Sequence, residues 1–164
     1  ISILIILDSQ GPIFFISERV GKDNNIFLMP KFRSMHQKTK LKSTSAFNDY
    51  SNITRVGKYI RRYNLDELPQ LFLVLNNKMS LVGPRPSLKS QIKLNNLRKK
   101  YKISSLLPGI TGLAQINGRD KLSINQKISY EKIYLSKRSF FFNLKIICLT
   151  FLKIIQNDEN IKKY

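Results

Sequence analysis

Residues 53–86 read ITRVGKYIRRYNLDELPQLFLVLNNKMSLVGPRP, and this stretch decides most of what the sequence predicts. Two adjacent carboxylates, Asp66 and Glu67, follow a run of cations: Arg55, Lys58, Arg61 and Arg62. Nearby positive charge keeps carboxylates ionised at neutral pH. An ionised carboxylate can act as a nucleophile or bind magnesium, and arginine can hold phosphate in a bidentate fork. The stretch therefore indicates phosphoryl-type chemistry on an anionic substrate.

Each part of this stretch also has a simpler interpretation. Acids in the first turn of a helix are stabilised by the helix dipole, and on local pattern alone this capping role is favoured for Asp66 and Glu67. The four cations fit a solvated helix face, and residues 83–86 fit a structural turn. The occurrence of all these features in one stretch favours the chemical interpretation, because each supplies something that phosphate chemistry needs.

Hydrophobic spacing predicts an α+β fold, mainly helical, with a small β-hairpin or sheet and amphipathic helices at a membrane interface. Apolar runs at 13–16 and 26–29 flank a turn-rich segment and predict the hairpin. The polar residues 34–52 predict a mobile loop. We expect a single domain over residues 1–164, with a core of ordinary size.

The predicted helices lie mainly after this loop. Residues 55–63 form the first of them, and Asn64 or Asp66 caps the next, which carries an apolar stripe at helical spacing: Leu68, Leu71, Phe72 and Leu75. Ser87 is expected to cap a basic helix over 87–102. The remaining elements are a loop with a short extended piece over 106–120 and helices over 123–136 and 139–155.

The charge balance indicates a polyanionic partner. Lys and Arg total 29 against 10 Asp and Glu, a formal net charge of +19. Such an excess suits nucleic acid, an anionic lipid surface or phosphorylated substrates, although codon bias toward lysine accounts for part of it. The one cysteine, Cys148, excludes a disulfide within the chain, and His36 is expected to be exposed and without a catalytic role.

Two apolar segments bear on membrane attachment. Residues 1–7 are far shorter than the ~20 apolar residues needed to span a bilayer. We interpret them as the remnant of an N-terminal membrane segment, and the alternative is an ordinary strand or helix end. Residues 139–155 contain Lys145 and Lys153, and charges at a bilayer centre are costly. This segment is therefore an amphipathic helix, packed on the core or lying in a membrane interface.

Three longer motifs carry a resemblance to a known family: LDELPQL at 65–71, MSLVGPRP at 79–86 and PGITGLAQINGR at 108–119. They resemble the bacterial sugar transferases, the monotopic polyprenol-phosphate phosphoglycosyl transferases that start surface glycan assembly. The resemblance runs from about residue 8 to residue 155. Glu131 and Asn143 stand where the family tends to have Asp.

The resemblance implies a reaction and a set of roles. The family transfers a phosphosugar from a UDP-sugar to a membrane polyprenol phosphate and releases UMP. It implies that Asp66 is the nucleophile and that Glu67 is its partner in binding Mg²⁺, with both carboxylates as metal ligands. The substrate-binding residues that it implies are Lys31, Arg33, Arg61, Pro84, Arg85, Pro86 and Arg119, with Arg85 in the nucleotide site.

The resemblance also places the chain at the cytoplasmic face of the bacterial inner membrane, as a monotopic protein on its anionic surface, with no nucleic acid as partner. Two other functions stay open at this point. One is a non-enzymatic basic protein that binds anionic membranes or nucleic acid. The other is an inactive, truncated transferase. The tight cluster of acids and arginines favours the enzyme, because a nucleic-acid binder has no need of the acidic pair.

Overall fold

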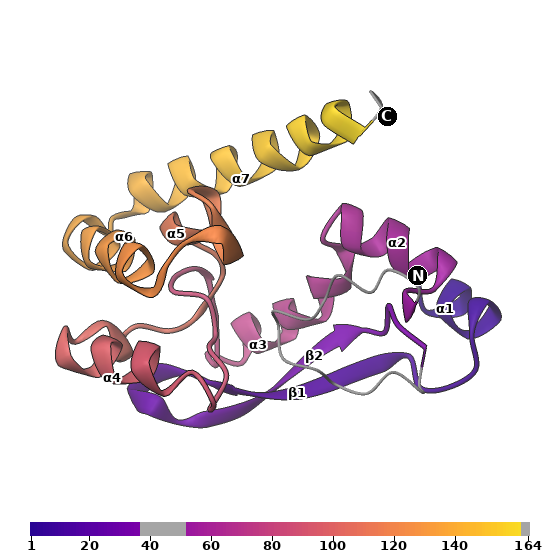
Figure 1. The fold of residues 1–164 in the computed structure, drawn as a ribbon, viewed down its shortest axis with the longest axis horizontal. Helices are drawn as coiled ribbons and strands as arrows, with labels where there is room; N and C mark the ends of the chain where they lie inside the picture. The colour runs from indigo at the N-terminus through magenta and orange to yellow at the C-terminus, as the bar shows by residue number, and fades with distance from the viewer. Residues whose placement is uncertain (37–51, 162–164) are drawn as a thin grey trace. The chain divides into compact units, whose positions relative to one another are not determined.

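The structure is a computed structural model that describes residues 1–36 and 52–161, with side chains described as far as Gln156 (Figure 1). The chain forms two compact units. The first holds Ile1–Ile16 and Pro30–Pro69, and the second holds Ser17–Met29 and Gln70–Tyr164. The elements are mainly helices with a few short strands, which confirms the α+β fold class. The assignment of the whole chain to one domain stays a prediction.

The predicted hairpin is confirmed. β1 (Phe14–Val20) and β2 (Ile26–Phe32) form a two-stranded sheet and are joined through the 3₁₀ turn η1 (Lys22–Asn24). Asp23 and Asn24 have left-handed backbone angles, with φ of 52° and 61°. Asp and Asn tolerate this conformation better than other non-glycine residues. The tip of the hairpin therefore lies where the sequence places its turn residues.

Two helices lie side by side in the first unit, α1 (Ser2–Asp8) and α2 (Arg55–Arg62) (Figure 1). The Asp8 carboxylate accepts a hydrogen bond from the Val56 N–H at 2.9 Å. This contact satisfies one of the free N–H groups at the start of α2 and brings a negative charge to its positive end. The predicted basic helix is thus confirmed, and α1 supplies part of its N-terminal support.

Gly57 brings the start of α2 against the segment that follows β2. A Cβ atom on Gly57 would lie 2.1 Å from the Ser34 carbonyl oxygen. The same carbonyl accepts a hydrogen bond from the Thr54 N–H at 3.1 Å, and the Thr54 side chain accepts one from the Gly57 N–H at 2.9 Å. Glycine is therefore required here by close backbone approach.

The predicted loop over 34–52 lies largely outside the described residues. Its two ends are described, and they pair with each other. Met35 and Ile53 form an antiparallel bridge, and the His36 N–H donates to the Asn52 carbonyl at 3.0 Å. His36 is exposed, as the sequence predicts, while its backbone takes part in this pairing.

The second unit contains a small parallel sheet of β3 (Ser80–Val82) and β4 (Gly109–Thr111). Three glycines let the segments after these strands press together. A Cβ atom on Gly109 would lie 2.1 Å from Gly83 N, and one on Gly112 would lie 2.1 Å from Gly83 O. The short extended piece predicted over 106–120 is confirmed as β4. The turn at 83–86 and the glycine-rich loop that contains β4 form one packed structure.

The basic helix predicted over 87–102 is shorter than expected. It is α4 (Ile92–Lys100), and the prediction that Ser87 caps it is wrong. Ser87 is committed elsewhere: its carbonyl accepts from the Val20 N–H at 2.9 Å, and its hydroxyl donates to Asn95 Oδ1 at 2.6 Å. A residue paired in this way with β1 cannot also take the capping position of α4.

The helix predicted after Asn64 is split into two. Leu65–Gln70 form a 3₁₀ helix, η4, and Leu71–Leu75 form the short α3. Pro69 contributes to the split because it has no N–H to donate to an α-helical ladder. The expected apolar stripe is exposed rather than packed, at Leu68, Leu71, Phe72 and Leu75. Leu73 packs in the protein instead, in a small core with Met29 and Met79.

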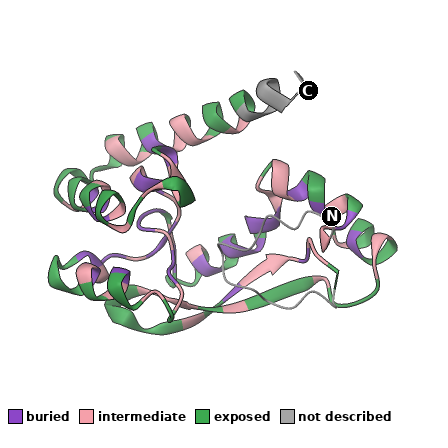
Figure 2. Ribbon diagram, in the orientation of Figure 1, coloured by how far each residue is buried: buried purple, intermediate pink, exposed green. Residues whose placement is uncertain are grey.

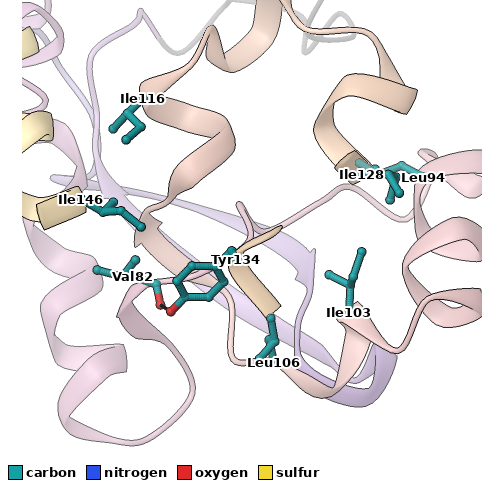
Figure 3. Close-up of a cluster of buried hydrophobic side chains, with 8 residues drawn as sticks. All are labelled: Val82, Leu94, Ile103, Leu106, Ile116, Ile128, Tyr134 and Ile146. Atoms are coloured by element: carbon teal, nitrogen blue, oxygen red, sulfur yellow. Dashed lines mark hydrogen bonds between the residues drawn. The ribbon is translucent and has the colours of Figure 1, made fainter. Parts of the chain in front are cut away.

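The larger core lies in the second unit among α4, α5 (Leu113–Ile116), α6 (Ile124–Lys137) and α7 (Phe140–Ile161). Figure 3 shows its buried side chains, which are Val82, Leu94, Ile103, Leu106, Ile116, Ile128, Tyr134 and Ile146. The Tyr134 hydroxyl donates to the Val82 carbonyl at 3.0 Å, which ties α6 to the end of β3. The helices predicted over 123–136 and 139–155 are both confirmed.

α7 contacts the rest of the second unit through the buried Ile146 and through polar residues. Three of its polar residues reach other elements: Asn143 Oδ1 lies 3.0 Å from Tyr134 Oη, Thr150 Oγ1 lies 2.7 Å from Thr111 Oγ1, and Lys153 Nζ donates to the Ile116 carbonyl. The large apolar side chains on other faces of the helix are exposed, at Phe140, Phe141, Leu144, Phe151, Leu152 and Ile155 (Figure 2). Among the described residues, no helix has both the length and the apolar character to cross a bilayer.

Candidate active site

The acidic pair stands at the start of η4, directly after α2. The chain leaves α2 through Asn64, whose left-handed backbone (φ 54°) turns it and whose carbonyl accepts from the Glu67 N–H at 3.1 Å. The turn buries both acids, so that Asp66 is 9% and Glu67 6% exposed. A tight local turn thus presents two adjacent carboxylates in a largely solvent-excluded place.

Lys31 brings a cation to this pair from β2. Its Nζ atom donates to Glu67 Oε1 at 2.7 Å and lies 3.8 Å from Asp66 Oδ2. Phe32, the next residue, points its ring to the opposite face of the strand and stacks on Phe14 with ring centroids 5.5 Å apart. The first unit therefore brings together three of the residues that the sequence singled out, and one ammonium group reaches two carboxylates.

Arg33 makes side-chain contacts at the end of α1. Its guanidinium closes the C-terminal end of α1, where Nη2 donates to the Ser9 carbonyl at 2.5 Å and Nη1 to the Gln10 carbonyl at 2.9 Å. A third contact runs from Nη2 to the Ile5 carbonyl at 3.3 Å. Arg33 is only 6% exposed. These contacts give Arg33 a structural role as a helix cap, and its role toward substrate stays a prediction.

Arg61 lies in the last turn of α2, five residues before Asp66, and is half-buried. The neighbouring Arg62 places its guanidinium 5.6 Å from the centre of the Tyr63 ring. Both arginines belong to the same unit as the acidic pair. The role of Arg61 toward phosphate stays a prediction.

The other residues assigned to substrate belong to the second unit. Pro84 and Pro86 are buried, and Arg85 between them is half-buried. The Pro84 carbonyl accepts from the Gly109 N–H at 2.8 Å, which holds the turn against the loop before β4. Burial makes the two prolines supports for the Arg85 backbone. Arg119 has a left-handed backbone (φ 52°) and is also half-buried.

Sequence reasoning missed the residues that fix this turn from behind. Asn95 of α4 accepts from the Ser87 hydroxyl and donates from Nδ2 to the Leu88 carbonyl at 3.1 Å. One turn further along α4, Arg98 forms a buried fork with Glu131 of α6, with Nε–Oε2 and Nη2–Oε1 distances of 2.8 and 2.5 Å. The helical spacing of Arg98 from Leu94 was the available clue, because it puts a cation on the apolar face of the helix.

Tyr134 is a second group that the sequence did not identify. Burial raises the pKa of its hydroxyl above the ordinary value of 10.0, and the charge of Arg138 and the hydrogen bond with Asn143 partly offset this effect. Glu131 and Tyr134 lie on the same helix, one turn apart, and both face the core. The two departures from the family pattern, Glu131 and Asn143, are therefore core contacts and not part of the acidic pair.

A family model described as bacterial sugar transferase matches residues 1–157, and the chain belongs to that family. The resemblance drawn from the motifs is thus confirmed.

Several relatives are similar over most of the chain. EpsL of Bacillus subtilis, named an uncharacterized sugar transferase, is 40% identical over 148 residues, which cover 90% of this chain and 72% of that protein. A UDP-glucose:undecaprenyl-phosphate glucose-1-phosphate transferase of Klebsiella pneumoniae is 41% identical over 158 residues, 88% of this chain and 33% of that protein. A UDP-N-acetylgalactosamine-undecaprenyl-phosphate N-acetylgalactosaminephosphotransferase of Aeromonas hydrophila is 36% identical over 160 residues, 94% of this chain and 38% of that protein. The chain thus spans about a third of the longer two.

The acidic pair also fits the expected metal. Asp66 and Glu67 offer carboxylate oxygens, the ligands that Mg²⁺ prefers, and the Lys31 ammonium shows that the place accepts a cation. In the described part of the chain, no three His, Cys, Asp or Glu side chains gather into a metal-holding group. Mg²⁺ commonly takes one or two protein carboxylates and completes its shell with water and substrate phosphates. The pair therefore suits a magnesium ion shared with a phosphate-bearing substrate.

Proposed function

We propose that this chain is a polyprenol-phosphate phosphoglycosyl transferase, which moves a sugar-1-phosphate from a UDP-sugar to a membrane polyprenol phosphate and releases UMP. The observation that carries the proposal is the buried acidic pair with Lys31 against it, in a chain of the bacterial sugar transferase family. Relatives named for reactions of this type support it. Their names include different sugars, so the proposal specifies a UDP-sugar and no particular sugar.

In the proposed reaction, an oxygen of the Asp66 carboxylate attacks the phosphorus that bears the sugar. The new bond is an acyl phosphate, and the bond that breaks joins this phosphorus to the oxygen bridging the two phosphates. The electron pair of that bond leaves on UMP. In the second half, a phosphate oxygen of the polyprenol phosphate attacks the same phosphorus. The Asp66–phosphorus bond breaks, and the carboxylate is regenerated with the lipid diphosphate sugar as product.

Charge is the main obstacle to the first step, because a carboxylate must approach an anionic diphosphate. Bound Mg²⁺ would supply positive charge to both at this point, with Glu67 and Asp66 as its protein ligands. Lys31 already neutralises part of the acidic charge at 2.7 Å from Glu67. In this proposal Arg61 contacts a substrate phosphate, for which the guanidinium fork is well suited. Arg85 belongs to the nucleotide site, and Arg119 is a further substrate-binding residue.

The direct test measures UMP. The chain, held on vesicles that contain polyprenol phosphate, is incubated with a panel of UDP-sugars and Mg²⁺. We expect UMP release with at least one UDP-sugar and a radiolabelled lipid product of equal amount. A chain that binds vesicles but releases no UMP with any sugar would support the alternatives of an inactive transferase or a non-enzymatic basic protein.

We further propose that the chain works on the cytoplasmic face of the bacterial inner membrane, attached through apolar helix faces. Each unit exposes such a face: Ile3 and Leu7 on α1 are 73% and 77% exposed, and Phe141 on α7 is 79% exposed. Exposed apolar faces of this kind suit a membrane interface, and the net charge of +19 suits anionic lipid.

Vesicle sedimentation tests this attachment. The chain is expected to co-sediment with anionic vesicles at low salt, to be partly released at high salt, and to bind neutral vesicles less. The double variant Phe141→Ser/Phe151→Ser is expected to weaken vesicle binding at least about tenfold. Two aromatic rings that become buried in the membrane interface contribute several kcal/mol to binding. Tyr130→Ser on α6, which removes one half-buried aromatic ring outside α7, is the control. Equal binding by the α7 variant and the control would remove α7 from the proposed attachment.

A further inference from the structure

The contact between Lys31 and the acidic pair has a consequence for metal binding. Glu67 and Asp66 are adjacent carboxylates whose side chains are 7% and 13% exposed, and the Lys31 side chain is 18% exposed. A buried carboxylate is costly without a counter-charge, and two adjacent ones also repel each other. The ammonium of Lys31 therefore supplies the pair with positive charge in the protein without metal.

We propose that Lys31 is an internal counter-ion that competes with a divalent cation for the acidic pair. The inference rests on the proposed function, which makes Asp66 and Glu67 the metal ligands. The Lys31 charge offsets part of the negative charge of the pair before metal binds, and the metal takes over that contribution when it arrives. The net negative charge of the site is then kept low both without and with bound metal. Competition from Lys31 weakens metal binding until substrate phosphates bind and add their own contacts to the metal.

The geometry of the contact suits exchange rather than permanent pairing. Lys31 Nζ lies 2.7 Å from one carboxylate and 3.8 Å from the other, so it makes one short contact and one long one. Its charge sits at the end of a flexible four-carbon stem. The backbone that carries it is held separately, because Arg33 N donates to the Ile13 carbonyl at 2.8 Å and Phe32 stacks on Phe14. The ammonium can thus move away while β2 stays in place.

The strand position explains why a metal would displace only the side-chain end. Lys31 precedes Phe32 by one residue, so the two side chains point to opposite faces of β2. Packing of the aromatic pair does not depend on where the ammonium lies. Loss of the lysine charge is therefore expected to alter metal binding without altering the hairpin.

Manganese binding tests the proposal directly. Mn²⁺ bound to the full chain is measured by electron paramagnetic resonance for wild type, Lys31→Met and Lys31→Arg. We expect Lys31→Met to bind Mn²⁺ at least about tenfold more tightly, since a positive charge within about 4 Å of the ligands is removed. Lys31→Arg keeps the charge and is expected to bind as weakly as wild type. Lys22→Met, an exposed lysine of the same hairpin, removes an equal charge elsewhere and is expected to leave affinity unchanged.

Thermal unfolding gives a second readout that does not depend on turnover. In a chelator, Lys31→Met removes the Lys31 charge from beside the acidic pair and is expected to melt below wild type. Mg²⁺ is expected to restore most of the difference, whereas it raises the melting temperature of wild type only slightly. The double variant Lys31→Met/Glu67→Gln removes one charge of each sign. It is expected to melt close to wild type in chelator and to gain no Mn²⁺ affinity.

Two results would overturn the inference. One is Mn²⁺ affinity in Lys31→Met that equals or falls below that of wild type, which would make Lys31 a residue that merely holds the ligands. The other is a melting temperature of Lys31→Met that Mg²⁺ does not raise. Wild-type UMP release separates a failure of the counter-ion proposal from a failure of the proposed transferase function. Mg²⁺-dependent release together with unchanged Mn²⁺ affinity rejects the counter-ion and keeps the transferase, whereas tighter Mn²⁺ binding without any UMP release does the reverse.

Discussion

The two units each bury carboxylates against a cation, but they do so in different ways. In the second unit, Arg98 and Glu131 form a fork in which two guanidinium nitrogens meet both oxygens of one carboxylate, at 2.8 and 2.5 Å. In the first unit, the single ammonium of Lys31 reaches two carboxylates at unequal distances, 2.7 and 3.8 Å. A planar fork fixes both partners, whereas a point charge on a flexible stem leaves them free to take other partners.

This difference separates a structural ion pair from a chemical site. The fork links α4 to α6, and α4 in turn holds the segment after Arg85 through Asn95. The lysine links β2 to the turn that carries Asp66. A carboxylate that must bind metal or attack phosphorus has to exchange its partner during the reaction, and one that fastens two helices must not. Substitutions at the two places are therefore expected to separate activity from stability.

The largest effect is expected at Asp66. Asp66→Asn keeps the size and polarity of the side chain but removes the negative charge and the nucleophilic oxygen. We expect UMP release to fall at least about a thousandfold, as happens when a covalent nucleophile is removed from an enzyme. Release is measured by a coupled UMP assay, with circular dichroism as a check on folding.

Asp120→Asn, an exposed acid in the second unit, is the matched control and is expected to keep its activity. The helix-capping interpretation makes the opposite prediction for Asp66→Asn. It expects a stability loss of about 1 kcal/mol with most of the activity kept. Near-normal UMP release from a well-folded Asp66→Asn protein would exclude the covalent route.

The second effect concerns metal at the same site. Chelation by EDTA is expected to stop UMP release, and added Mg²⁺ to restore it. Glu67→Gln removes one proposed ligand, so its activity is expected to need more Mg²⁺ for half-maximal rate, by about tenfold or more. The measurement is a Mg²⁺ titration of UMP release for both proteins. Activity that ignores EDTA would show that the role given to Glu67 is wrong.

In the second unit the effect moves from activity to stability. Arg98→Met leaves Glu131 buried without its partner, and Glu131→Gln does the same to Arg98. Breaking a buried ion pair from one side costs about 3–5 kcal/mol. The double variant Arg98→Met/Glu131→Leu removes both charges and is expected to recover much of that loss. Urea unfolding measures the three variants against wild type.

Activity per folded molecule provides the contrast with the first unit. We expect the double variant to release UMP within about tenfold of wild type under conditions where it is fully folded, because Arg98 and Glu131 act only through packing. A double variant that is stable but inactive would move this pair from a structural role to one in positioning Arg85. That outcome would remove the distinction between the two ion pairs.

The sequence predicted the helices and strands better than the surfaces against which they pack. The hairpin, α2, α6 and α7 follow from spacing and turn residues, and these local features determine which residues share a face. They do not determine which face is covered. The spacing of Leu71 and Phe72 predicts a helix face, yet that face is exposed. α7 contacts the protein through polar residues, Asn143 and Thr150, as well as through the buried Ile146.

In the candidate active site, too, the sequence predicts local features but not the contacts between distant residues. The adjacent acids at 66 and 67 are visible as a local motif, and the family resemblance gave them roles. The contact with Lys31 joins residues 36 positions apart, and no local pattern predicts such a pairing. Arg33, which the resemblance assigns to substrate, donates hydrogen bonds to carbonyls at the end of α1, and no local pattern predicts that contact either. Tertiary contacts, which a single sequence does not contain, decide between these uses.

The smallest effect is expected at Tyr134, a neutral group that also joins two elements of the second unit. Tyr134→Phe removes the hydroxyl that donates to the Val82 carbonyl at 3.0 Å, and the expected loss of unfolding free energy at pH 8 is about 1 kcal/mol. Burial raises the pKa of this hydroxyl above 10.0, so the folded protein holds the proton more tightly than the unfolded chain. The stabilisation from this group is then fully present below about pH 10 and is lost as the pH rises toward the folded pKa. The stability gap between wild type and Tyr134→Phe is therefore expected to narrow between pH 8 and pH 11, because only wild type loses this contribution.

The other titrating side chains, including Arg138, are common to both proteins, and their effects largely cancel in the difference. Urea unfolding of both proteins at the two pH values measures the gap. A gap that stays constant would mean that the hydroxyl ionises as easily in the folded core as in the unfolded chain, and the bond to Val82 would then be weaker than its geometry indicates.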